Sequence, residues 1–99
     1  IMADYATNLF YASTPNEKDR EKLEQFFDEE TCDCMFMGDD NHIEGEFLSR
    51  CEFPEKEMNE LIASLDAPNE LYLRVLTHDL SNEYVSFRIY SGGEWNIKL

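Results

Sequence analysis

The stretch "YATNLFYASTPNE", residues 5–17, changes its period part-way along, and this change decides the fold. Residues 5–12 alternate between two faces, as expected of a strand that is buried on at least one side. The letters that follow predict a helix start, with Thr14 as the N-cap, Pro15 at the first helical position and Glu17 closing a capping box. Because apolar residues at helical spacing continue to residue 27, we expect a helix over residues 15–29.

Downstream of this helix, the sequence returns to a strand pattern. The segment "CDCMFM", residues 32–37, is apolar at alternate positions, and "GDDN", residues 38–41, is dense in turn-forming residues. The segment "HIEGEFLSRCEF", residues 42–53, alternates again. Two alternating segments joined by such a turn predict a β-hairpin.

A second helix and further strands complete the pattern. Pro54 opens a helix whose apolar residues Met58, Leu61, Ile62 and Leu65 form a single stripe, and "DAPN", residues 66–69, ends it. We expect strands at residues 70–78 and 83–91, with "DLSN" as the turn between them, and a short last strand at residues 94–99 after Gly92 and Gly93.

The order of these elements is β-α-β-β-α-β followed by one or two further strands. It predicts an α+β fold of the ferredoxin-like type, an antiparallel sheet with two helices on one face. We expect a single domain over residues 2–99, with Ile1 a cloning remnant ahead of a natural start at Met2. No window approaches the roughly 20 apolar residues of a membrane span, and no signal peptide is recognisable, so we expect a cytoplasmic protein.

Acidity is the most unusual feature of the composition. The formal net charge is −14, and residues 28–60 contribute most of it, because only Arg50 and Lys56 oppose twelve acidic residues there. Such a charge repels DNA, RNA and anionic membranes, so we expect no direct nucleic-acid or membrane ligand. The field favours a basic protein as partner, including one that itself binds nucleic acid. The alternative is that the acidity serves solubility alone.

The predicted hairpin and second helix place the acidic residues that we expect to bind this partner. In the strand of residues 42–53, Glu44 and Glu46 lie on the face opposite Ile43 and Phe47. Side chains two residues apart on a strand are roughly 6.6–6.8 Å apart, similar to the roughly 6–7 Å between successive phosphates on one DNA strand. The complete predicted site is Asp39, Asp40, Glu44 and Glu46, with Glu57 and Glu60 on the polar side of the second helix.

Thiol and imidazole groups offer a competing interpretation. Cys32, Cys34, Cys51 and His42 lie on or beside the hairpin, and such groups bind zinc. The C-x-C spacing differs from the usual C-x2-C, however, and Cys32 and Cys34 share one face of a strand, so we expect them in the core. Three cysteines cannot form a complete internal disulfide set, and reduced thiols are the simplest interpretation.

We predict neither catalytic residues nor a cofactor. The segment "DDNHIEGE" departs from a calcium-binding loop, because Ile43 occupies the third ligand position and Gly45 comes one place late. No Gly-rich phosphate loop is present. With 22 acidic residues in the chain, a chance pair of carboxylates needs no catalytic explanation.

Aromatic residues of the later strands raise a question about the uncovered face of the sheet. Tyr72, Tyr84 and Tyr90 lie at alternating positions, so some are candidates for that face. An open, partly aromatic face would also suit a homodimer. The favoured interpretation is that the extra strands, with Trp95, complete the core.

The opening "MADYATNLFYAS", residues 2–13, resembles that of the plasmid- and phage-borne YubB-like ferredoxin domains, which begin with a Met-Ala-Asn-Trp-Cys-x-Asn-x-Leu type of strand. The residues that fit are Met2, Ala3, Tyr5, Asn8 and Leu9, whereas Ala6 stands where the family tends to have Cys. The Gly-Gly-Glu-Trp of residues 92–95 is also similar to the tail of that group. The resemblance covers about fifteen residues and implies a ferredoxin-like fold and an origin on a mobile element, with no catalytic residue carried over.

Together, the small size, the acidity and this resemblance favour a non-enzymatic inhibitor of the anti-CRISPR or anti-restriction type. Such a protein would occupy the nucleic-acid site of a nuclease or defence complex. An immunity protein that neutralises a basic toxin would work by the same physics. The alternatives are a small metal- or thiol-dependent protein using the cysteines and His42, and an orphan domain.

Overall fold

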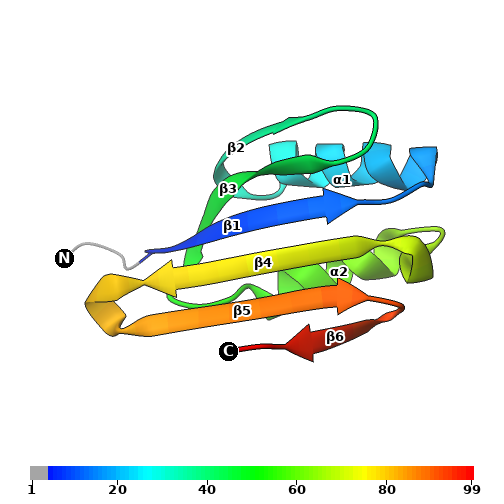
Figure 1. Cartoon of the computed structure of the whole chain (residues 1–99). Helices are drawn as coiled ribbons and strands as arrows, with labels where there is room; N and C mark the ends of the chain where they lie inside the picture. Colours follow the sequence, from blue (N-terminus) through cyan, green and yellow to red (C-terminus); the bar gives the residue numbers. More distant parts are fainter. Residues whose placement is uncertain (1–4) are drawn as a thin grey trace.

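The computed structural model describes residues 5–99 as a six-stranded antiparallel sheet with both helices on one face (Figure 1). The elements are β1 (Tyr5–Ser13), α1 (Glu17–Glu29), β2 (Cys32–Gly38), β3 (Ile43–Arg50), α2 (Glu55–Ser64), β4 (Tyr72–Asp79), β5 (Tyr84–Ser91) and β6 (Glu94–Ile97), with 3-10 turns η1 (Pro68–Glu70) and η2 (Leu80–Asn82). The sheet order is β2-β3-β1-β4-β5-β6. The predicted ferredoxin-like order is thus confirmed, with two extra strands at the C-terminal edge. Met2 and Ala3 of the family resemblance lie outside the described residues.

The core lies between the sheet and the helices because each strand alternates its side chains between two faces. On β1, Phe10 points toward the helices and stacks on Phe27 of α1 with ring centroids 4.0 Å apart. Phe47 of β3 packs against both rings. Within residues 5–99, no helix covers the other face of the sheet (Figure 1).

The start of α1 differs from the prediction. The N-cap is Asn16, not Thr14: the Asn16 side chain accepts a hydrogen bond from the Asp19 N–H at 2.9 Å. Thr14 instead accepts a bond from the Asn16 N–H at 3.2 Å, and Pro15 precedes the helix. Asn competes well as a cap, so the turn closes two residues later than the capping-box pattern indicated.

Strand β3 ends at Arg50, three residues before the predicted end, because Cys51 takes a left-handed backbone conformation with φ 63°. Two side chains fasten the loop that follows. Ser49 Oγ donates to the Glu52 carbonyl at 2.7 Å, and Tyr84 Oη accepts from the Phe53 N–H at 3.1 Å. Helix α2 then begins at Glu55, close to where Pro54 predicted it.

The prediction that Cys32 and Cys34 share the core is wrong. Asp33, between them, has φ 50°, and the register of β2 against β3 shifts between Cys32 and Met35. This bulge leaves Cys32 exposed, whereas Cys34 is half-buried against the core. Burial raises the pKa of the Cys34 thiol above its usual value.

The C-terminal strands complete the core, as favoured. Trp95 packs edge-on against Phe53 and Tyr90, and its indole N–H donates to Asn59 Oδ1 of α2 at 2.9 Å. Of the three tyrosines considered for the open face, only Tyr72 lies there. Tyr90 is buried, and Tyr84 points to the helix side. Across residues 5–99, no helix is long and apolar enough to cross a membrane.

Candidate functional site

The face of the sheet without helices is the most distinctive surface of the molecule. Along each strand, the residues of this face alternate with the buried ones. The row of paired residues that crosses the middle of the face is largely apolar. This row consists of Met35, Glu46, Leu9, Leu76 and Phe87, from β2 to β5. Leu9 is 42% exposed and Met35 is 73% exposed. Contiguous apolar side chains on an uncovered face are typical of interaction surfaces.

The two glutamates predicted on β3 lie on this face. Glu46 is in register with Met35 of β2 and Leu9 of β1, and Glu44 is in register with Met37 and Tyr11. Both glutamates are exposed. The alternation predicted for β3 is therefore confirmed: Ile43 and Phe47 are buried on the opposite side.

A groove of about 540 Å³ follows β3 on this face. Met35 and Met37 form the wall on the side of β2, and Leu9 lies on the side of β1. Glu44 and Glu46 lie between these walls, and Phe10, Phe36 and Gly45 also contribute to the lining. The groove therefore combines apolar walls with two carboxylates.

The hairpin tip is held rigidly by Asp39. Its Oδ1 accepts hydrogen bonds from the N–H groups of Asn41 and His42, at 2.8 and 3.1 Å. These bonds hold the pKa of Asp39 below its usual value. Arg20 of α1 donates to the Asp39 carbonyl at 3.1 Å, which fixes the tip to the helix layer. Asp40, next to it, is exposed.

His42 connects this tip with the face of the sheet. Its ring stacks on Tyr11 with centroids 4.9 Å apart. Its Nδ1 lies 3.4 Å from Asp39 Oδ1, and its Nε2 lies 3.9 Å from Glu44 Oε2. On the other side of Tyr11, the Arg74 guanidinium lies 4.3 Å from the ring centroid. Asp39 and Glu44 thus belong to one ordered group of polar side chains.

The structure does not bring all six predicted residues together. Asp39, Asp40, Glu44 and Glu46 belong to the β2–β3 hairpin, whereas Glu57 and Glu60 are exposed on α2, in the helix layer. Because α2 covers the opposite face of the sheet (Figure 1), one flat partner surface cannot contact both groups. We call the first four residues the hairpin acidic group.

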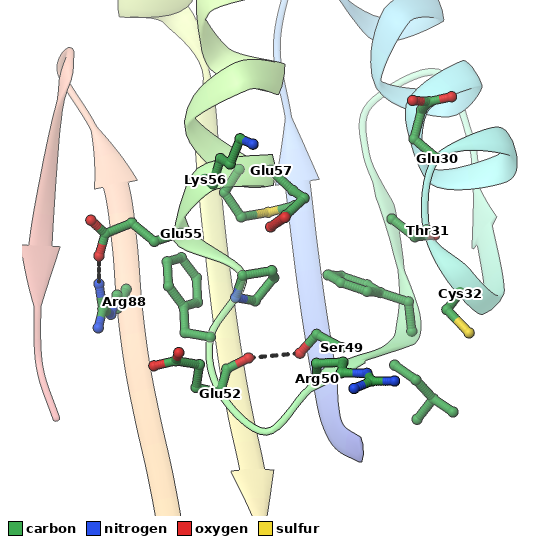
Figure 2. Close-up of a pocket in the computed structure, with 15 residues that line it drawn as sticks. Glu30, Thr31, Cys32, Ser49, Arg50, Glu52, Glu55, Lys56, Glu57 and Arg88 are labelled. Atoms are coloured by element: carbon green, nitrogen blue, oxygen red, sulfur yellow. Dashed lines mark hydrogen bonds and ion pairs between the residues drawn. The ribbon is translucent and has the colours of Figure 1, made fainter. Parts of the chain in front are cut away.

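A second hollow, of about 550 Å³, opens on the helix side between the end of α1 and the start of α2. Figure 2 shows Arg88 paired with Glu55 there, and Arg50, Lys56 and Glu57 at the rim. The Glu55–Arg88 distance is 3.2 Å. Both basic and acidic side chains line this hollow, so it presents no field of one sign to a ligand.

The cysteine-based alternative concerns Cys32, Cys34, Cys51 and His42. In the part of the chain that the structure describes, no group of three or more His, Cys, Asp and Glu side chains could hold a metal ion. Cys32 lines the hollow of Figure 2, and Cys51 is exposed in the loop after β3. His42 lies with Asp39 and Glu44 instead of with thiols.

Sequence reasoning missed the two methionines of the groove. Met35 and Met37 lie on either side of Phe36 along β2, so the alternation of a strand places both on the same face. Which face of β2 is uncovered depends on where the helices pack, and both helices lie on the other side of the sheet (Figure 1). Comparison of the chain with known protein families, curated proteins and solved structures gives no match.

Proposed function

We propose that this protein is a non-enzymatic inhibitor that binds a basic, nucleic-acid-binding protein and occupies its nucleic-acid site. A nuclease or defence complex is the kind of target that we propose, with the inhibitor encoded by a phage or another mobile element and acting in the cytoplasm. The observation that carries the proposal is the ordered display of Glu44 and Glu46 on the open face of β3, extended by Asp39 and Asp40 at the hairpin tip.

The spacing of these carboxylates supports mimicry of a phosphate backbone. Side chains two apart on a strand are separated by roughly 6.6–6.8 Å, similar to the through-space distance between neighbouring phosphates. The strand is internal to the sheet, so the two glutamates are held by pairing on both sides. A rigid display of this kind binds with less loss of conformational entropy than flexible acidic side chains on a loop.

The charge of the whole chain supports the same proposal. A net charge of −14 steers a basic partner toward the molecule and makes association sensitive to salt. Mutual repulsion among these charges opposes folding. A binding role would compensate for that cost, whereas charge needed for solubility alone could be smaller.

The experiment that tests the proposal is capture of the partner by the immobilised protein from a lysate of the native host. We expect a basic nucleic-acid-binding protein that is retained at low salt, lost as salt rises, and displaced by added DNA or RNA. The Glu44→Lys/Glu46→Lys variant should lose this capture. The Glu57→Lys/Glu60→Lys variant, which changes the net charge equally but in the helix layer, should retain most of it.

Loss of capture in both variants to the same extent would show that only the total charge matters. Capture that neither salt nor nucleic acid affects would contradict occupation of a nucleic-acid site. All four substituted side chains are exposed, so we expect both variants to fold. Far-UV circular dichroism of each variant checks this.

A further inference from the structure

The groove beside β3 restricts what the hairpin acidic group can bind. An acidic surface meant only to repel or attract at a distance needs no apolar walls. Here Met35 and Met37, 73% and 72% exposed, stand along one side of the two glutamates, and Leu9 stands along the other. An occupant must therefore satisfy carboxylates and cover apolar side chains at the same time.

Resting on the function proposed above, we infer that the groove binds an extended segment of the partner with Lys or Arg at alternate positions. These side chains have an aliphatic stem and a charged head. The stem can pack on Met35, Met37 and Leu9 while the head reaches a carboxylate. Because Glu44 and Glu46 are two residues apart on a strand, a segment with the same repeat matches them one to one.

The charges around the groove are suited to such a segment. Within the described residues, Glu46 has no ion-pair partner, and Glu44 has only His42, at 3.9 Å. On this face, Arg74 of β4 lies against Tyr11 and Tyr72, beyond the wall of β1. Incoming basic side chains therefore meet carboxylates that are not already neutralised by a lysine or arginine.

The walls are suited to a partner whose apolar side chains vary. Methionine has three rotatable bonds and a polarisable sulfur, so it adapts to differently shaped neighbours. Two methionines on the same face of an edge strand can adapt to the shape of an incoming chain more closely than β-branched residues could. Recognition would then depend on the spacing of the basic residues more than on the residues between them.

A second copy of this chain is a poorer occupant. Two-fold pairing through this face would bring the same patch of each copy together. Glu44 and Glu46 of both copies would then be desolvated near one another, in a protein of net charge −14. Charge complementarity therefore favours a basic segment over a dimer.

The test uses two fluorescein-labelled peptides of identical composition, one with Arg and Val alternating and one with the Arg residues clustered. Fluorescence anisotropy with the full-length protein should give affinity for the alternating peptide that is about tenfold higher. Met35→Ser/Met37→Ser and Glu44→Gln/Glu46→Gln should each weaken binding of that peptide about tenfold. The control Ile97→Ser/Leu99→Ser, which removes two exposed apolar side chains at the opposite edge, should not change it.

Equal affinity for the two peptides, or no effect of the methionine substitutions, would overturn the groove as a docking site. Capture of a nucleic-acid-binding protein that depends on Glu44 and Glu46 would nevertheless leave the proposed function standing. Conversely, specific binding of the alternating peptide without such a captured partner would support the groove while contradicting the inhibitory role. A dimer in sedimentation that Met35→Ser/Met37→Ser dissociates would show a second copy as the occupant and overturn the inference.

Discussion

Asp19 shows how one acidic residue in this acidic chain serves the fold instead of a partner. It is fully buried, and its two carboxylate oxygens accept hydrogen bonds from the N–H groups of Asp66 and Ala67, both at 2.8 Å. These bonds tie α1 to the loop that follows α2. Charge-assisted hydrogen bonds of this kind are stronger than neutral ones.

Replacing Asp19 with Asn should therefore destabilise the protein. The amide retains one acceptor and sets an NH2 group against the second backbone N–H, so we expect the free energy of unfolding to fall by about 2–4 kcal/mol. Urea denaturation measures this directly. The control Glu21→Gln, on an exposed position of the same helix, should change it by less than about 0.5 kcal/mol. Equal stability of the two variants would show that the buried carboxylate is dispensable.

Asp79 makes a pH-dependent contribution to the free energy of unfolding. Hydrogen bonds from Ser81 Oγ at 2.8 Å and Asn82 Nδ2 at 2.6 Å lower its pKa below the ordinary value of 3.8. Because the folded-state pKa is the lower one, this stabilisation is present above pH 3.8 and is lost as the pH falls through the folded-state pKa.

The Asp79→Asn variant isolates that contribution. Wild type should be the more stable protein near neutral pH, and the difference in unfolding free energy should shrink once the pH falls below 3.8. Urea titrations of both proteins over this range give the comparison. A difference that stays constant would mean that the ionised form of Asp79 is not favoured by folding.

At the scale of the elements, the closeness of β2 to β3 depends on Gly45. A Cβ there would lie 2.6 Å from the Phe36 Cα and would also strike the Met35 carbonyl oxygen. Gly45→Ala should thus push the edge strand away from β3, at a cost of about 1–3 kcal/mol. Since β2 carries the groove wall, its amides should lose protection from hydrogen exchange before those of β4. Unchanged protection in β2 would contradict this account of the edge.

Periodicity was sufficient to predict the order of the elements, because both helices and the strands β1, β3, β4 and β5 have buried residues on one face. Alternation separated the two faces of β1 correctly, and it placed Glu44 and Glu46 of β3 opposite the buried Ile43 and Phe47. The pattern failed where one backbone torsion overrides it: the left-handed Asp33 exposes Cys32, and the left-handed Cys51 ends β3 early. Such torsions are rare for residues with a Cβ, and nothing in the alternating letters marks them.

The candidate site was predictable only within one element. The two-residue repeat of a strand is enough to place Glu44 and Glu46 on one face. Whether Glu57 and Glu60 lie beside these two residues depends on the position of α2 relative to the sheet, and long-range packing determines that position. The exposure of Met35 and Met37 depends on the sheet order, which the local pattern does not specify.

At the scale of the whole molecule, charge and shape have different roles. The chain measures 42 × 25 × 20 Å along its principal axes, and its acidic residues are distributed over both layers. Distributed charge steers a basic partner from any direction. Within residues 5–99, the hairpin side combines an apolar groove with Glu44 and Glu46, which pair with no lysine or arginine, so we expect docking on that side.

We propose that the protein occupies a nucleic-acid site, and a competition experiment with nucleic acid tests this proposal. With the captured partner purified and bound to labelled nucleic acid, rising concentrations of wild type should displace the label completely. Glu57→Lys/Glu60→Lys should do so almost as well, and Glu44→Lys/Glu46→Lys should not. A ternary complex in which the label stays bound while wild type binds the partner would contradict the account.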